Sequence, residues 1–373
     1  MHYARYGKDG PEISRLGFGV MRLPPRRKGE WGSVNFSRAV PLMRRAMEAG
    51  VNFFDSHHNY HNGLSEVAIG RALEGWRGRP IVIQTKTPMY MVKPLSWFKK
   101  LFEQALEKCG VSQIDYLLFH SMTMETFQRR GRAFFALTEW AMKKGTLRHR
   151  GFSSHDTPEH VRAFIDTGEF SAMLVSYNWL NPQMAEVIEY AADKGMGVSV
   201  MNPVGGGVLG ETTPEILRLL PGARSSAEVS LRFVLSTPGV TTALSGMSAL
   251  EQVEENVRIA SRRVHMTARQ RKHMLARAER IRASQMQVCA ACGYCMPCPH
   301  GVDIPQNLLL LARAKILGLI ESGRDRFQHL RRHRDGDKSA AACRRCGRCL
   351  PKCPNRVPIM ERLRETAALL GTR

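Results

Sequence analysis

Eight of the nine cysteines of this 373-residue chain fall into two runs whose spacing is typical of metal ligands. Residues 289–299 read C-x2-C-x2-C-x2-C-P, and residues 343–354 read C-x2-C-x2-C-x3-C-P. Three cysteines at this spacing turn around one [4Fe–4S] cluster, and in two-cluster ferredoxins the fourth binds the other cluster. The pattern therefore predicts two clusters, one bound by Cys289, Cys292, Cys295 and Cys353, the other by Cys298, Cys343, Cys346 and Cys349.

Structural zinc is the alternative for these cysteines, because zinc sites with four cysteine ligands also use C-x2-C pairs. Two triplets that each end in Cys-Pro fit iron–sulfur clusters better. Dense cysteine use in a chain that shows no secretory signal pattern favours metal binding over disulfides, and it predicts a cytoplasmic protein. The ninth cysteine, Cys109, is predicted to be a packed small residue.

A second set of polar residues, Asp55, Tyr60, Lys86 and His120, follows or ends consecutive β-rich runs. Such residues at the end of an apolar strand are costly to bury unless they are paired or functional. Their types suggest proton donation to a carbonyl oxygen, with Tyr60 as the acid. We expect Lys86 to lower the pKa of Tyr60 and Asp55 to fix Lys86. His120 would orient the substrate oxygen or share the proton.

The elements that must position these residues alternate between β-rich runs and helical stretches. Several of the helical stretches end in glycine, as a C-cap requires. Eight βα units in about 250 residues predict a TIM (β/α)8 barrel, whose active site lies at the carboxyl ends of the strands. The expected strands are Leu16–Met21, Val51–Phe54, Ile81–Thr85, Ile114–Phe119, Arg150–Phe152, Ala172–Ser176, Gly197–Met201 and Thr241–Ser245.

The domain organisation follows from where this alternation stops. We expect an α/β barrel over residues 1–260 that opens with a small hairpin over residues 1–13. A connecting helix is predicted over residues 261–286. Residues 287–373 are predicted to form a mainly helical, ferredoxin-like domain with two clusters.

The first part of the chain resembles the aldo/keto reductase family. The resemblance rests on Val51–Asp55, Tyr60, Ser65-Glu66, Gly70–Leu73, Thr85-Lys86, and Ile114–Tyr116 with His120. It implies that Asp55, Tyr60, Lys86 and His120 form the catalytic tetrad, with Tyr60 as general acid and hydride from NAD(P)H. The tail, including Gly293-Tyr294 and Gly301–Pro305, resembles ferredoxin-bearing members of the family, and its long spacer resembles an α-helical ferredoxin.

The same resemblance implies a set of nicotinamide-cofactor contacts. The expected residues are Gly19, Met21, Ser153, Ser154, Met201, Pro203, Val204, Gly205, Gly207, Leu209, Ser245, Gly246, Met247, Gln252, Glu255 and Asn256. The chain departs from the family at Leu174, where a glutamine is usual, and at Met201, where a tyrosine commonly stacks on the nicotinamide. Gly246 and Gln252 occupy the basic positions expected beside a 2′-phosphate, so a preference for NADPH is not implied.

The net charge of +22 is concentrated in the last third of the chain. Residues 261–373 contain 24 Lys and Arg against 8 Asp and Glu. Such a surface could bind nucleic acid or attract an acidic protein partner. No nucleic-acid-binding module is recognisable, so the sequence favours an acidic electron carrier such as a ferredoxin or flavodoxin. No apolar run is long enough to predict a membrane span.

Three functions remain open from the sequence. The barrel could reduce a carbonyl substrate (an aldehyde, ketone or quinone) while the clusters form an appended domain. The clusters could instead relay electrons between a carrier and a flavin, quinone or substrate in the barrel. The third possibility is a non-catalytic iron–sulfur adaptor. His57, His58 and His61 crowd the loop of Tyr60 and are expected to line the pocket, with metal binding as the alternative.

Overall fold

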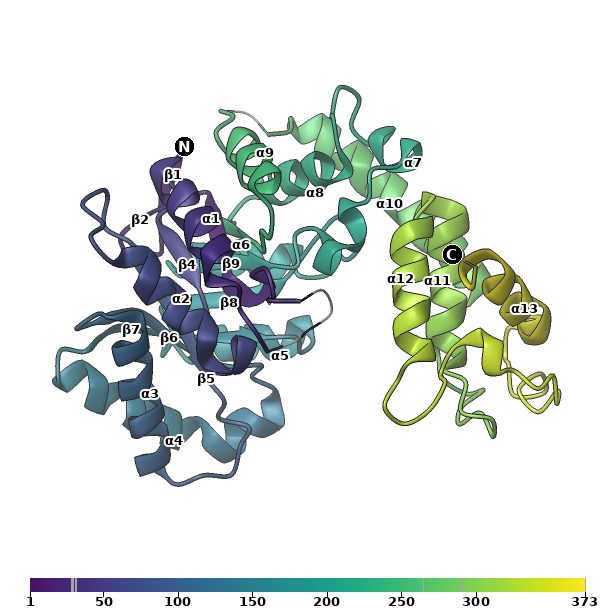
Figure 1. Ribbon diagram of the computed structural model, residues 1–373, viewed down its shortest axis with the longest axis horizontal. Coiled ribbons are helices and arrows are strands. Elements are labelled where there is room, and N and C mark those ends of the chain that lie inside the picture. Colours follow the sequence, from purple (N-terminus) through teal and green to yellow (C-terminus); the bar gives the residue numbers. More distant parts are fainter. Residues whose placement is uncertain (28–29, 31, 264, 290, 373) are drawn as a thin grey trace. The chain divides into compact units, whose positions relative to one another are not determined.

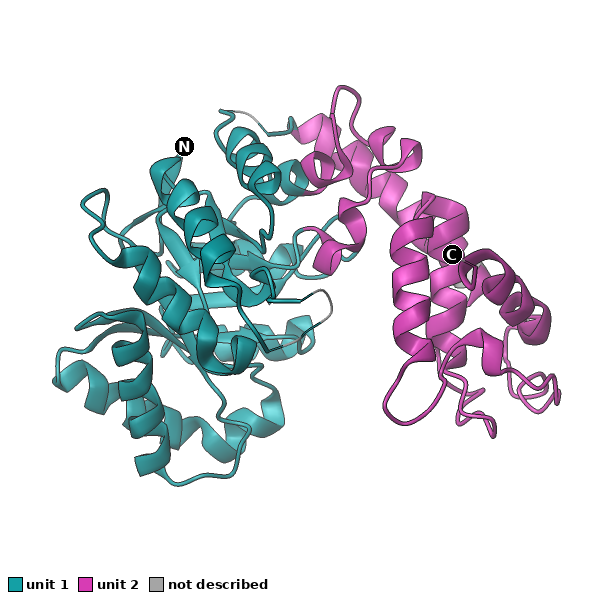
Figure 2. Cartoon of the chain, in the orientation of Figure 1, with its two compact units in different colours: residues 1–203, 231–267 teal, residues 204–230, 268–373 magenta. Residues whose placement is uncertain are grey.

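The structure is a computed structural model that describes the chain except residues 28–29, 31, 264, 290 and 373. The chain forms two compact units, shown in different colours in Figure 2. Unit 1 comprises residues 1–203 and 231–267, and unit 2 comprises residues 204–230 and 268–373. The compact units therefore group residues 204–230 with the C-terminal part of the chain, whereas the sequence assigns them to the barrel.

Unit 1 contains a closed barrel of parallel strands in the order β10-β3-β4-β5-β6-β7-β8-β9. This arrangement confirms the predicted TIM-barrel fold. The barrel-lining strands are buried along nearly their whole length, as parallel strands covered by helices should be. Their bounds are β3 Leu16–Gly19, β4 Phe53–Asp55, β5 Val82–Thr87, β6 Ile114–Phe119, β7 Leu147–Ser154, β8 Ala172–Ser176, β9 Gly197–Met201 and β10 Thr242–Ser245.

Helices of unit 1 surround these strands (Figure 1). Their buried faces repeat with helical period, as on α3, where Phe98, Phe102, Ala105 and Cys109 point inward. Cys109 is thus a buried packing residue, and Gly110 ends the helix with a φ of +65°. The bounds are α1 Phe36–Glu48, α2 Leu64–Leu73, α3 Leu95–Cys109, α4 Met124–Lys143, α5 Pro158–Asp166, α6 Ala185–Asp193 and α9 Leu250–Ala260. Helix α8 (Ser226–Leu235) begins in unit 2 and ends in unit 1.

An N-terminal hairpin, β1 (Tyr3–Arg5) and β2 (Glu12–Ser14), lies at the amino-terminal side of the barrel. Its Tyr6 is 1% exposed and packs edge-on against Phe53 and Tyr116. The Tyr6 hydroxyl hydrogen-bonds with Gln84 Oε1 and Ser199 Oγ, each at 3.0 Å. The hairpin therefore closes the barrel with a tyrosine whose polar end has partners in the core.

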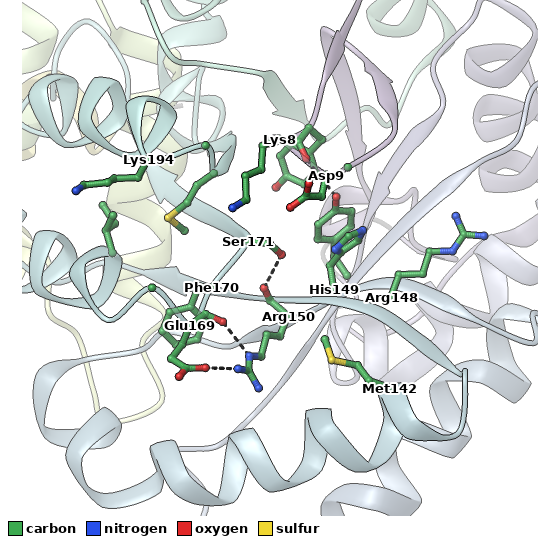
Figure 3. Close-up of a pocket in the computed structure, with 18 of the residues that line it drawn as sticks. Lys8, Asp9, Met142, Arg148, His149, Arg150, Glu169, Phe170, Ser171 and Lys194 are labelled. Atoms are coloured by element: carbon green, nitrogen blue, oxygen red, sulfur yellow. Dashed lines mark hydrogen bonds and ion pairs between the residues drawn. The ribbon is translucent and has the colours of Figure 1, made fainter.

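A pocket of about 690 Å³ also lies at this amino-terminal side (Figure 3). Lys8 and Asp9 of the hairpin line it together with residues at the beginnings of β7 and β8. Arg150 is engaged there, because its guanidinium pairs with Glu169 and its carbonyl accepts a hydrogen bond from Ser171. None of the predicted tetrad residues lines this pocket, so its chemistry differs from that of the opposite end of the barrel.

Unit 2 is mainly helical, as predicted. Its helices are α7 Pro214–Leu217, α10 Ala268–Val288, α11 Ile304–Leu317, α12 Ile320–Arg331 and α13 Ile359–Leu370. A core that includes Leu308, Phe327 and Leu363 holds α11, α12 and α13 together. The segment 204–230 is joined to this bundle, because Thr213 Oγ1 donates to the carbonyl of Leu317 and the Glu211 carboxylate accepts two backbone N–H groups at the start of α12. Among the described residues, no helix is both long and apolar enough to cross a membrane.

Candidate functional site

The centre of the site in unit 1 is a buried ion pair between Lys86 on β5 and Asp55 at the end of β4. Lys86 Nζ donates to both carboxylate oxygens of Asp55 at 2.7 Å and to the carbonyl oxygen of Ser56 at 2.6 Å. Lys86 is 3% exposed and Asp55 is 5% exposed. Burial lowers the pKa of Lys86, but the charges of Asp55 and Tyr60 and the hydrogen bonds to them together outweigh this effect, and the pKa is raised. The lysine is therefore held as a cation.

Tyr60 lies beside this cation in a short 3-10 segment, η2 (Tyr60–Gly63). Lys86 Nζ is 5.2 Å from the centre of the Tyr60 ring. Burial raises the pKa of Tyr60, and Lys86 lowers it by its charge and by a hydrogen bond, so that the net direction is upward. We expected Lys86 to lower the pKa of Tyr60, and the lysine does act in that direction. The enclosure of the phenol has the larger effect, and it keeps Tyr60 protonated near neutral pH.

His120, which directly follows β6, belongs to a group of neutral imidazoles above Tyr60. The ring of His57 lies 4.0 Å from that of His120 and 5.1 Å from that of Tyr60, and His57 Nε2 is 2.8 Å from His58 Nδ1. Burial lowers the pKa of His120 to about 3 and that of His58 to about 4. A neutral His120 can hydrogen-bond with a substrate oxygen without adding charge. Among the described residues, no group of three His, Cys, Asp or Glu side chains could hold a single metal ion.

Gln84 and Tyr6, which the sequence analysis did not single out, support the ion pair from inside the barrel. Gln84 is two positions before Lys86 on β5, so both side chains point to the same face. Gln84 Nε2 donates to Asp55 Oδ1 at 2.8 Å, while its oxygen accepts from Tyr6. A hydrogen-bonded chain therefore runs inside the barrel from Tyr6 through Gln84 and Asp55 to Lys86. The sequence could have indicated Gln84, because its two-residue spacing from Lys86 places both side chains on the same face of the strand.

The predicted nicotinamide contacts in unit 1 lie at the ends of the barrel strands. Ser153 and Ser154 end β7, and their hydroxyls hydrogen-bond with backbone groups of residues 119–122. Met201 ends β9, and its carbonyl accepts the N–H of Tyr177 at 3.2 Å. Pro203 follows two residues later. The two serines are thus held in place, and their contact with a cofactor stays a prediction.

Further predicted cofactor contacts, which include the expected adenine-binding pair Glu255 and Asn256, lie after β3 and after β10. Gly19 ends β3 and Met21 lies in the 3-10 segment η1 (Val20–Arg22), while Ser245 ends β10 and accepts a hydrogen bond from Asn256 Nδ2 at 3.0 Å. Gln252 Oε1 accepts the N–H of Ser248, Glu255 pairs with Arg258 at 3.8 Å, and Met247 is buried.

Sequence reasoning missed Arg22, which lies against Gly246. A Cβ atom on Gly246 would lie 2.7 Å from Arg22 Cγ. A side chain from a different element therefore places its stem beside these predicted cofactor contacts, where the expected basic positions carry Gly246 and Gln252.

The remaining predicted contacts, Val204, Gly205, Gly207 and Leu209, belong to unit 2. They lie at or in the segment η3 (Gly205–Gly210), where Gly205, Gly206 and Gly207 all have positive φ. Residues with a side chain rarely adopt this conformation, so glycine at these positions allows the turn. The contact of these residues with a cofactor stays a prediction.

In unit 2, two separate cavities gather the eight clustered cysteines. One is lined by Cys289, Cys292, Cys295 and Cys353. The other, of about 480 Å³, is lined by Cys298, Cys343, Cys346 and Cys349, with Cys295 on its wall. Each of the two sets thus combines cysteines from both sequence runs, as crossed ligation requires.

Hydrogen bonds at the sulfurs agree with thiolate ligands. The N–H of Ala291 donates to Cys289 Sγ at 3.3 Å, and the N–H of Val357 donates to Cys353 Sγ at 3.4 Å. Backbone donors of this kind stabilise negative sulfur and tune the potential of iron–sulfur clusters. The cysteine sets therefore fit iron–sulfur ligation, and the assignment of each set to its own [4Fe–4S] cluster stays a prediction.

Comparison with known families agrees with both parts of the chain. The model of the aldo/keto reductase family matches residues 15–219, and that of the 4Fe–4S dicluster domain matches residues 288–357. An oxidoreductase of Schizosaccharomyces pombe is 26% identical over 261 residues, covering 66% of this chain and 82% of the yeast protein. The NADH-specific methylglyoxal reductase of Escherichia coli is 23% identical, covering 66% of this chain and 89% of the bacterial protein.

Solved structures match the barrel. The holo form of an aldo-keto reductase from Bacillus halodurans has a TM-score of 0.63 at 24% identity, covering 74% of this chain and 96% of that one. A thermostable aldo-keto reductase in complex with the inhibitor epalrestat has a TM-score of 0.62 at 19% identity, covering 74% of this chain and 99% of that one. At these identities the likeness shows the fold.

Proposed function

Because this chain belongs to the aldo/keto reductase family and carries a 4Fe–4S domain, we propose that it reduces small carbonyl compounds with NAD(P)H. The observation that carries the proposal is the buried Lys86–Asp55 pair, with Tyr60 against the lysine at the carboxyl end of the barrel. The relative from E. coli is a methylglyoxal reductase, which agrees with a carbonyl substrate.

The chain's own residues would manage the proton in this reaction. A bound nicotinamide would supply the hydride to the carbonyl carbon. Tyr60 keeps its proton because burial raises its pKa, and it would donate that proton from Oη to the carbonyl oxygen as negative charge develops there. The Lys86 cation stabilises the phenolate that remains, and Asp55 holds the lysine in place. Neutral His120 would orient the carbonyl oxygen.

The residues at the strand ends fit a nicotinamide dinucleotide in part. Ser153 and Ser154 would lie beside the amide, and Asn256 and Glu255 beside the adenine. The stem of Arg22 lies beside Gly246, so we propose that its guanidinium contacts the 2′-phosphate of NADPH. Met201 cannot stack on the nicotinamide as an aromatic ring does, so the cofactor would be held mainly by polar contacts.

The decisive experiment measures the oxidation of NADPH and NADH with a panel of aldehydes, ketones and quinones. Tyr60→Phe should lower kcat/KM by roughly 10²- to 10⁴-fold, because it removes the general acid. The matched variant Tyr3→Phe removes a hydroxyl of the N-terminal hairpin that donates to the Gly50 carbonyl. It should leave turnover near the wild-type value. Full turnover by Tyr60→Phe would overturn the assignment of the acid.

A second candidate function is electron relay in the cytoplasm, and the two cysteine cavities favour it. Iron–sulfur clusters exchange single electrons, so coupling to a hydride needs a group that accepts both one and two electrons, such as a flavin or a quinone. In this alternative an acidic carrier protein would exchange electrons with the clusters. Turnover that requires the external carrier, with no response to nicotinamide, would support relay over self-sufficient reduction.

A further inference from the structure

The two cysteine runs differ completely in the charge of their neighbours. Residues 289–302 contain no Lys, Arg, Asp or Glu. Between residues 343 and 356 there are five cations and no acidic residue. We call these five residues the cationic loop: Arg344, Arg345, Arg348, Lys352 and Arg356. One cavity is therefore bordered by a neutral loop, and the other mainly by a strongly positive one.

The cationic loop surrounds the cavity of the second cysteine set. Arg344, Arg348 and Lys352 line this cavity together with Cys343, Cys346 and Cys349. All five cations are exposed, and so is Cys346. None of the five forms an ion pair with another described residue. Their charges are therefore available to a partner beside this cavity.

The loop also carries an apolar centre. Leu350 is 36% exposed between Arg348 and Lys352, and Pro351 beside it is exposed as well. An apolar contact with a charged rim is typical of protein–protein interfaces. Four of the five cations are arginines, which bind carboxylates with two parallel hydrogen bonds. An aliphatic tip among arginines favours a protein with surface carboxylates over nucleic acid, whose bases would call for aromatic side chains.

We propose that the cationic loop is the docking surface for an acidic protein that carries single electrons. Its partner would exchange electrons with the cluster bound by Cys298, Cys343, Cys346 and Cys349. In the exchange one electron leaves the reduced carrier and reduces this cluster by one electron, with no atom transferred. The inference rests on the proposed clusters, and it does not depend on carbonyl reduction.

Binding of an acidic [2Fe–2S] ferredoxin to the full, cluster-loaded chain tests this proposal. Calorimetry at about 50 mM and 300 mM salt would compare wild type with Arg344→Glu/Arg348→Glu. The matched control is Arg269→Glu/Lys272→Glu, which makes the same charge change on exposed residues of α10. Lys272 lies 16 residues before Val288, where α10 ends next to Cys289. This is about 24 Å along the helix axis, so the control charges are far from that cysteine. Iron and sulfide assays would show that each variant keeps its clusters.

We expect the loop variant to weaken binding at low salt by about tenfold or more, and the control by less than about threefold. Wild-type affinity should fall with salt, because the attraction acts between exposed charges. Equal effects of the two variants would overturn the proposal, as would the absence of ferredoxin binding. Tighter binding of a DNA or RNA oligonucleotide at the same loop would also overturn it. Because the readout is binding, failure of carbonyl reduction would leave this result unchanged.

Discussion

Replacement of Lys86 by methionine should destabilise the barrel strongly, because it leaves the Asp55 carboxylate buried without its cation. Lys86 Nζ donates to the two Asp55 oxygens and to the Ser56 carbonyl. After the substitution, the Gln84 amide at 2.8 Å would be the one side-chain donor to Asp55 left among the described residues. Methionine has a similar length and fits an apolar site, so the loss would come from the charge and not from a cavity.

The expected magnitude follows from the burial of the pair. The side chains of Lys86 and Asp55 are 2% and 7% exposed. Removing one partner of such a buried pair costs about 3–5 kcal/mol, because the remaining charge lacks both water and a counter-charge. The exposed pair of Lys144 and Glu103, with side chains 50% and 51% exposed, gives a control of the same chemistry. Lys144→Met should cost less than about 1 kcal/mol.

Native-state hydrogen exchange with mass spectrometry would measure this loss locally, in peptides that contain β4 and β5. Local measurement is needed because a chain of two units does not unfold as one two-state domain. The double variant Asp55→Asn/Lys86→Met should lose clearly less free energy of unfolding than the two single variants lose together, because it leaves no uncompensated charge. A loss at Lys86→Met as small as that at Lys144→Met would refute the argument that the pair is buried and ionised.

Three further predictions concern the ligands, the cofactor and pH. With crossed ligation, Cys292→Ala/Cys353→Ala should retain about four irons per chain, whereas Cys292→Ala/Cys298→Ala should lose both clusters; equal iron content would contradict the crossed sets. Arg22→Ala should raise KM for NADPH about tenfold and leave KM for NADH within about twofold. The same rise for both cofactors would show that Arg22 does not bind the 2′-phosphate. Burial lowers the pKa of His120 to about 3, so the unfolded chain binds a proton below about pH 6.5 while the folded chain does not. Stability from this group is therefore present above pH 6.5 and is lost as pH falls toward 3. Hydrogen-exchange protection of peptides around His120 that rises on acidification from pH 7 to 5 would contradict this.

Much of the fold follows from the sequence because strand and helix periods are local properties. The expected strands Ile114–Phe119, Ala172–Ser176 and Gly197–Met201 have the same bounds in the structure. The expected strand Leu16–Met21 is shorter, since the chain turns into a 3-10 segment after Gly19. The association of residues 204–230 with unit 2 depends on contacts of Glu211 and Thr213 with residues more than 100 positions later, which no local pattern reveals.

The site was predictable as a set of residues but not as an electrostatic system. Strand ends indicate which side chains meet, and Lys86 does pair with Asp55. The direction in which the pKa of Tyr60 shifts depends instead on how far the protein buries the phenol, and this burial is set by the packing of all residues around the carboxyl end of the barrel. Arg22 was missed for a related reason, since it approaches Gly246 from another strand's end.

Crossed ligation has a consequence for how unit 2 folds. Each predicted cluster joins the loop before α11 to the loop before α13, so neither loop can close its site alone. Six of the cysteines also pack against the apolar core of this unit: Cys289, Cys295, Cys298, Cys343, Cys349 and Cys353. Cluster binding would therefore tie both loops to the helices, and metal affinity would contribute directly to folding. The exposed cationic loop would then be held in shape by the cluster beside it, so a chain without its clusters should also lose the docking surface.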